Sequence, residues 1–91
     1  MSKTLSLTKE LILKKSITPL DEGCQDLLIS HLKLLGFKIE KMPHGKVSNF
    51  YARKGHEAPL LVFAGHTDVV PTGPEEEWSS PPFEPTIKND R

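Results

Sequence analysis

The chain has 91 residues, which is enough for one small domain at most, because domains usually run to ~100–150 residues. Its 12 basic and 12 acidic side chains balance, which argues against a basic nucleic-acid surface or a polybasic membrane patch. A lone cysteine, Cys24, excludes a disulfide within the chain, and no apolar run approaches the ~20 residues of a membrane span. We therefore expect a soluble cytoplasmic protein.

The first predicted helix covers residues 6–16. Leu7, Leu11 and Ile12 fall on one side of it, while the lysines between them stay exposed. The residue before a proline avoids the helical region, so Thr18 and Pro19 are expected to end this segment.

The second predicted helix covers residues 22–35, with Asp21 as its N-terminal cap and Gly36 as its stop. Its expected apolar stripe consists of Cys24, Leu27, Leu28, His31, Leu32 and Leu35. On this stripe Cys24 is expected to be a small buried hydrophobe rather than a nucleophile. His31 is expected to be an ordinary histidine at the boundary of the core rather than a metal ligand.

A β-hairpin is expected next. Residues 37–42 and 47–53 alternate as strands, and a Pro-His-Gly-Lys turn at residues 43–46 separates them. His44 and His56 lie in turns, where we expect them to be solvated.

An unbroken apolar run at residues 60–64 predicts a strand buried on both faces, as in the parallel sheet of an α/β protein. The run passes through Gly65 to His66 and Asp68. Ligands of open α/β sheets bind beyond the carboxyl ends of the strands, so this pair lies where chemistry is expected.

The pair also has a chemical logic. A neutral imidazole is a good zinc ligand, and a metal-bound histidine usually donates its other N–H to a carboxylate. At i and i+2 in extended chain, His66 and Asp68 leave on the same side, so the carboxylate can orient the ring. His-x-Asp is a short pattern, and a buried strand with a solvated polar end remains the simpler interpretation of the spacing alone.

The chain beyond Pro71 is rich in proline and acid. The three glutamates at residues 75–77 predict a solvated loop, and residues 78–85 are expected to be held by Trp78 and Phe83. Residues 86–88 could open one more strand.

The sequence Gly-His-Thr-Asp-Val-Val-Pro at residues 65–71 resembles the first metal-site motif of the dinuclear zinc aminoacylase/carboxypeptidase family. The similarity covers nearly the whole chain, because further segments also match this family, at residues 21–25, 35–37, 49–53 and 78–87.

The resemblance implies a site with two zinc ions, or cobalt in their place. His66 would be a ligand of one metal, and Asp68 would orient His66 and support catalysis; no substrate-binding residue is identified. The flanking segments look like the family member that releases succinate from N-succinyl-diaminopimelate, on the bacterial route to lysine. Acetylornithine deacetylase or an aminoacylase is the alternative within the family. The full-length protein would be a homodimer in the cytoplasm.

The resemblance further implies an α/β fold. Residues 1–91 would be the N-terminal portion of a zinc-peptidase-like catalytic domain, with two helices followed by a mixed β-sheet that is incomplete. The family's bridging aspartate, its paired glutamates and its lid or dimerisation domain would all lie beyond Arg91. A catalytic zinc needs three protein ligands, and the motif supplies one, so we expect the 91-residue chain alone to be inactive. Two helices can cover only one face of the sheet, so we also expect the isolated chain to be prone to aggregation.

Two other classes stay open. A small non-catalytic α+β binding module would fold by itself without metal. A truncated open reading frame with no biochemical role would keep its old motifs.

Overall fold

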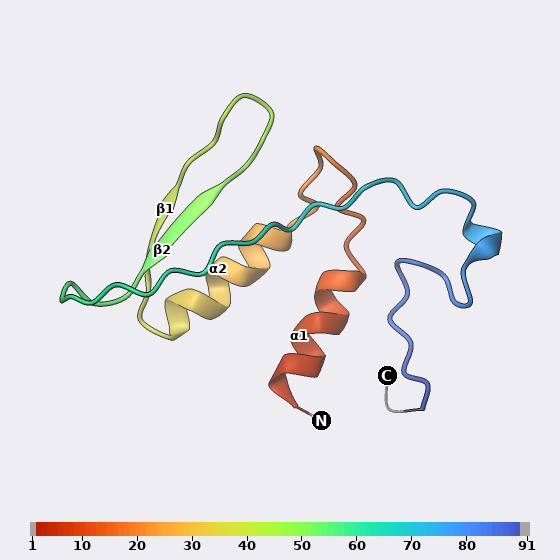
Figure 1. Ribbon diagram of the computed structural model, residues 1–91, viewed down its shortest axis with the longest axis horizontal. Helices are drawn as coiled ribbons and strands as arrows, with labels where there is room; N and C mark the ends of the chain where they lie inside the picture. The colour runs from red at the N-terminus through yellow and green to blue at the C-terminus, as the bar shows by residue number, and fades with distance from the viewer. Residues whose placement is uncertain (1, 90–91) are drawn as a thin grey trace.

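The computed structural model describes residues 2–89 and combines two α-helices with an antiparallel pair of strands (Figure 1). The elements follow the order α1 (Lys3–Ile12), α2 (Cys24–Leu34), β1 (Lys38–Lys41), β2 (Phe50–Arg53) and the 3₁₀ turn η1 (Glu75–Glu77). The expected α/β class is confirmed. The expected mixed sheet is wrong for the described residues, whose sheet consists of β1 and β2 in antiparallel register.

Helix α1 begins and ends earlier than the hydrophobic pattern predicts. The Ser2 hydroxyl accepts a hydrogen bond from the Leu5 N–H at 3.0 Å, which satisfies one of the free donors of the first turn and starts the helix at Lys3. Leu7 and Leu11 are partly buried, as their spacing predicts, whereas Ile12 is 37 % exposed.

Helix α2 is close to its predicted bounds. The N-cap residue is Gly23 and not the predicted Asp21, but both carboxylate oxygens of Asp21 accept the Gln25 N–H of the first turn at 3.2 Å. Cys24 is buried, as expected, and Ile29 is the other fully buried apolar residue of this helix. The outer part of the predicted stripe is wrong: His31 is exposed and Leu35 is 60 % exposed, because the C-terminal end of α2 has too few neighbours to cover them.

Gly23 sets the start of α2 because it adopts a left-handed conformation at φ 85°. We expect Gly23→Ala to lower the free energy of unfolding by about 1–2 kcal/mol, the cost of a left-handed L-residue. Steric clash adds little, since an added Cβ would lie 3.5 Å from the Lys14 Nζ. Urea denaturation of the protein at the length that its native cell produces measures this loss. Gly65→Ala is the matched control, because its φ is not left-handed and nothing lies within 4 Å of the added Cβ.

The predicted hairpin is confirmed. Ile39 pairs with Ala52 and Lys38 with Arg53 in antiparallel register. The next residue on the Ile39 face, Lys41, reaches Asp26 of α2 at 3.5 Å, so this face of the hairpin is turned toward α2. The turn closes with reciprocal backbone bonds between His44 and Val47 at 2.8 and 3.0 Å.

The expected central strand at residues 60–64 is wrong for the described chain. These residues are extended but form no ladder, and their apolar side chains are exposed: 78 % for Leu61 and 89 % for Phe63. A strand buried on both faces needs a hydrogen-bonded neighbour and a layer above and below, and residues 2–89 provide none of these along the run. Pairing starts only further on, at the parallel bridge between Ile17 and Val69.

The described chain is open for its length. Its radius of gyration is 15.5 Å, whereas a compact domain of this size has about 12 Å. Within residues 2–89 only Cys24 and Ile29 are fully buried hydrophobic residues. The core is therefore small, and both of these buried apolar residues lie on α2.

The segment after Pro71 contains little regular structure. The glutamate run forms η1 and stays exposed, and the Trp78 indole N–H donates to the Thr72 carbonyl at 3.1 Å. Residues 86–88 form no strand. No helix in the described part of the chain is long and apolar enough to cross a membrane.

Candidate functional site

Two segments that lie far apart in the sequence form a short parallel pair beside the His66–Asp68 motif. The Val69 N–H donates to the Ser16 carbonyl at 2.9 Å, and the Thr18 N–H donates to the Val69 carbonyl at 2.9 Å. In Figure 1 the chain that follows the hairpin runs past α2 to the loop between α1 and α2, where this pairing occurs. The motif is thus anchored to the loop between α1 and α2.

Side-chain hydrogen bonds strengthen this anchor. The Ser16 hydroxyl donates to the Thr67 carbonyl at 2.7 Å, and Ser16 is only 3 % exposed. The Thr67 hydroxyl in turn donates to Asp21 Oδ1 at 3.3 Å. The residue between His66 and Asp68 is therefore tied both to the end of the α1 loop and to Asp21 at the start of α2.

His66 is oriented by Asp68. Its Nδ1 lies 2.8 Å from the Asp68 carbonyl oxygen and 3.0 Å from Asp68 Oδ1. Both partners are acceptors, so Nδ1 carries the ring proton and donates it. In the neutral ring, Nε2 then keeps its lone pair, and the His66 side chain is 80 % exposed. The proximity predicted from the i, i+2 spacing is confirmed.

Asp68 is held from its other side by Thr18. The Thr18 hydroxyl donates to Asp68 Oδ2 at 2.5 Å. This bond to Thr18, followed by the hydrogen bond and the charge interaction with His66, lowers the pKa of Asp68 from the ordinary value of 3.8, against a smaller opposing effect of desolvation. Asp68 is therefore a carboxylate at neutral pH, the form that accepts both bonds.

The depressed pKa predicts a pH dependence with a definite sign. Asp68 contributes stability above its unfolded pKa of about 3.8, and this contribution is lost as pH falls through the lower pKa of the folded state. Asp68→Asn has no such titration, so we expect the difference in denaturation midpoint between the two proteins to shrink as pH falls below about 4. Urea denaturation across this pH range measures the difference. A difference in midpoint that stays constant with pH would contradict the lowered pKa of Asp68.

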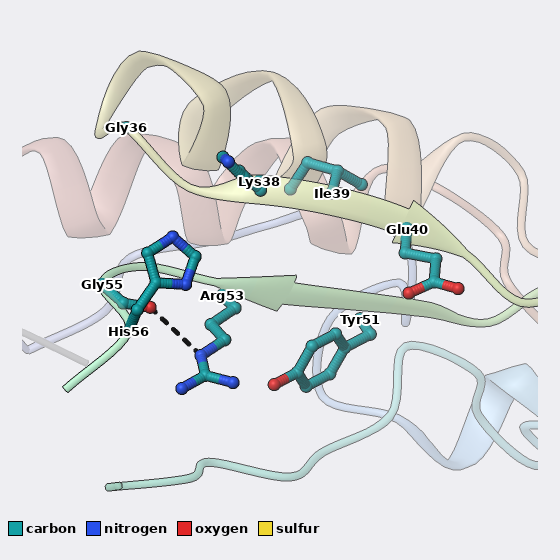
Figure 2. Close-up of a pocket in the computed structure, with 8 residues that line it drawn as sticks. All are labelled: Gly36, Lys38, Ile39, Glu40, Tyr51, Arg53, Gly55 and His56. Carbon is teal, nitrogen blue, oxygen red and sulfur yellow. Dashed lines mark hydrogen bonds between the residues drawn. The ribbon is translucent and has the colours of Figure 1, made fainter. Parts of the chain in front are cut away.

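A separate hollow of about 490 Å³ lies on the hairpin (Figure 2). Its lining includes Lys38, Arg53 and His56, and the Arg53 Nε–H donates to the Gly55 carbonyl at 3.1 Å. Lys38 and Arg53 lie opposite each other on the face turned away from α2. Neither His66 nor Asp68 lines this hollow, so it is not the site that the motif predicts.

The donor chemistry of His66 fits one metal ligand. A histidine whose Nδ1–H is bound to a carboxylate and a carbonyl presents Nε2 in the form that coordinates zinc. Within residues 2–89, however, no three histidine, cysteine or carboxylate side chains gather as a possible metal site. A catalytic zinc site needs three protein ligands, so the described residues do not form such a site by themselves.

Sequence reasoning missed Ser16 and Thr18. Both precede Pro19 in a segment whose only sequence signal is the end of a helix. Their partners lie about 50 residues away, and no local pattern links positions so distant.

The amino-acid sequence was compared with the sequences of known proteins. No family model matches the chain. It is 64 % identical over 89 residues to the succinyl-diaminopimelate desuccinylase of Methylobacillus flagellatus, and 58 % identical to that of Coxiella burnetii. Each alignment covers 98 % of this chain. The chain is similar to part of succinyl-diaminopimelate desuccinylase. It spans 24 % of the length of these curated relatives.

This coverage agrees with the small core of residues 2–89. A succinyl-diaminopimelate desuccinylase of the relatives' length has about three quarters of its residues outside the aligned part. The exposed apolar side chains at residues 60–63 are consistent with this partial coverage.

Proposed function

We propose that this chain is a portion of a succinyl-diaminopimelate desuccinylase. The protein that carries it hydrolyses the amide bond of N-succinyl-diaminopimelate and releases succinate and diaminopimelate. The observation that supports this most is the identity of 58–64 % over 98 % of the chain with proteins of that name. In this proposal residues 1–91 form the N-terminal portion of the catalytic domain, and the 91-residue chain alone is inactive.

His66 binds one of two zinc ions through Nε2 in this proposal, and cobalt can take the same place. The tautomer argument supports this role, since Asp68 occupies the Nδ1 side of the ring at 2.8–3.0 Å. Asp68 holds the proton on Nδ1 and fixes the plane of the ring. The bound metals supply Lewis-acid polarisation of the amide carbonyl and an activated water nucleophile.

The remaining ligands, the general base and the residues that recognise the substrate come from polypeptide outside this chain. The complete protein is a cytoplasmic homodimer in this proposal. The 80 % exposure of the His66 side chain supports the idea that further groups approach it from outside the described residues.

The first experiment is the intact mass of the protein as its native cell produces it. A mass several times that of 91 residues supports the proposal, and a mass equal to 91 residues leaves the metal site incomplete in one chain. The purified protein is then assayed with N-succinyl-diaminopimelate and N-acetylornithine, before and after chelation and after return of zinc or cobalt. Preference for N-acetylornithine would favour the deacetylase. No metal-dependent hydrolysis of either would favour a binding module.

A further inference from the structure

Asp68 is held at both oxygens, and only one of these bonds involves the histidine. Oδ1 lies 3.0 Å from His66 Nδ1, while Oδ2 accepts the Thr18 hydroxyl at 2.5 Å. The Asp68 side chain is 43 % exposed, so without Thr18 its second oxygen would be hydrated and free to rotate. Two anchors on opposite oxygens fix the carboxylate plane.

The Thr18 hydroxyl has a second possible acceptor, the Val69 carbonyl at 3.1 Å. A hydroxyl has one proton, and the shorter contact is to a charged oxygen, which makes the stronger bond. The Val69 carbonyl already accepts the Thr18 backbone N–H at 2.9 Å. The hydroxyl proton therefore goes to Asp68.

Thr18 is itself fixed in place. The parallel pairing of Ser16 and Thr18 with Val69 sets the distance between the two segments, and the buried Ser16 hydroxyl bonds the Thr67 carbonyl. The threonine side chain thus approaches Asp68 from a segment whose backbone is hydrogen-bonded to Val69.

We propose that Thr18 is a positioning residue of the metal site: its hydroxyl holds Asp68 in the orientation that keeps the proton on His66 Nδ1 and Nε2 free for the metal. The chain of contacts runs from Thr18 through Asp68 to the ring of His66. The inference rests on the proposed function, since it treats His66 as a metal ligand. It assigns to the loop between α1 and α2 a part in setting metal affinity.

The test uses the protein at the length that its native cell produces, with Thr18→Val and Thr18→Ser. Valine keeps the branched shape and removes the hydroxyl, whereas serine keeps the hydroxyl. Thr8→Val is the matched control, because the Thr8 hydroxyl donates to the Thr4 carbonyl at 2.7 Å in α1, away from the site.

Two readouts are measured. Zinc affinity comes from competition with a chelator, and the tautomer of the metal-free His66 ring comes from ¹⁵N chemical shifts in mildly alkaline buffer, assigned with His66→Gln. We expect Thr18→Val to weaken zinc binding by about 10-fold, the lower end of the effect of losing a partner beyond the ligands. The same variant shifts the ring toward the Nε2–H tautomer. Thr18→Ser and Thr8→Val leave both readouts unchanged.

The outcomes distinguish the proposed function, in which His66 is a metal ligand, from the positioning role of Thr18. If His66→Ala retains zinc affinity, the proposed function fails. If His66→Ala loses zinc but Thr18→Val matches the unsubstituted protein in both readouts, only the role of Thr18 is overturned. An equal loss of affinity in Thr8→Val would reduce the effect to general destabilisation and overturn the role of Thr18 too. Should Thr18→Val fail to fold, the unsubstituted protein decides: a ring mainly in the Nε2–H form contradicts the inference, and the Nδ1–H form supports it.

Discussion

Replacing His66 with alanine is expected to lower kcat/KM for N-succinyl-diaminopimelate by more than about 100-fold, because losing a ligand exceeds the 10–100-fold typical of losing a partner behind it. The variant keeps Asp68 and Thr18 but lacks the ring nitrogen that would bind the metal. The protein is assayed at the length that the native cell makes, and its metal content is measured by elemental analysis alongside the steady-state rates. Activity and metal content are expected to fall together.

His44→Ala is the matched control for this prediction. His44 is also an exposed histidine outside the helices and strands, and it forms backbone hydrogen bonds with Val47 within the hairpin turn. We expect it to keep the rate and the metal content of the unsubstituted protein. A His66→Ala protein with full metal content and a rate within about 10-fold of normal would contradict the ligand role.

The isolated 91-residue chain is expected to self-associate and to show no amide hydrolysis with added zinc. Its most exposed apolar run has 61 % exposure at Leu60, 78 % at Leu61, 62 % at Val62 and 89 % at Phe63, on extended backbone without a strand partner. Unpaired extended backbone with contiguous apolar side chains is a template for pairing between chains. Light scattering coupled to size-exclusion chromatography over a range of concentrations measures the association.

Charge placed in the run is expected to reverse this association. Leu61→Lys combined with Phe63→Lys should move the chain toward the monomer, because charged side chains on exposed edges oppose pairing. Leu20→Lys is the control, since Leu20 is 53 % exposed but lies outside the apolar run. A concentration-independent monomer of the unsubstituted chain with a cooperative thermal transition would refute the expectation.

Short sequence patterns correctly predicted those structural elements that depend on contacts between residues close in sequence. The alternation of residues 37–42 and 47–53 gave the hairpin, because strand partners a few residues apart need only a turn between them. Asp21 and Gly36 bracketed α2 to within two residues at each end, since helix termini depend on nearby caps. The closeness of His66 and Asp68 likewise follows from two residues of extended chain.

The missing central strand and the missing mixed sheet have one cause. The apolar run at residues 60–64 indicates that these side chains favour burial. A β-strand forms, however, only when another strand is hydrogen-bonded to it. The described residues offer no such strand, so the run stays exposed. The same limit explains why Thr18 escaped prediction: its bond to Asp68 depends on how the whole chain folds back.

The parallel pairing at Val69 has a consequence for the order of folding. It joins residues about 50 positions apart, and closing a flexible loop of that length costs about 3–4 kcal/mol of chain entropy. Helix α2 and the hairpin lie inside this loop, and their formation shortens the part that remains flexible. We therefore expect the His66–Asp68–Thr18 arrangement to form late, after these local elements. Substitutions that slow the hairpin should delay the ordering of His66 without touching it.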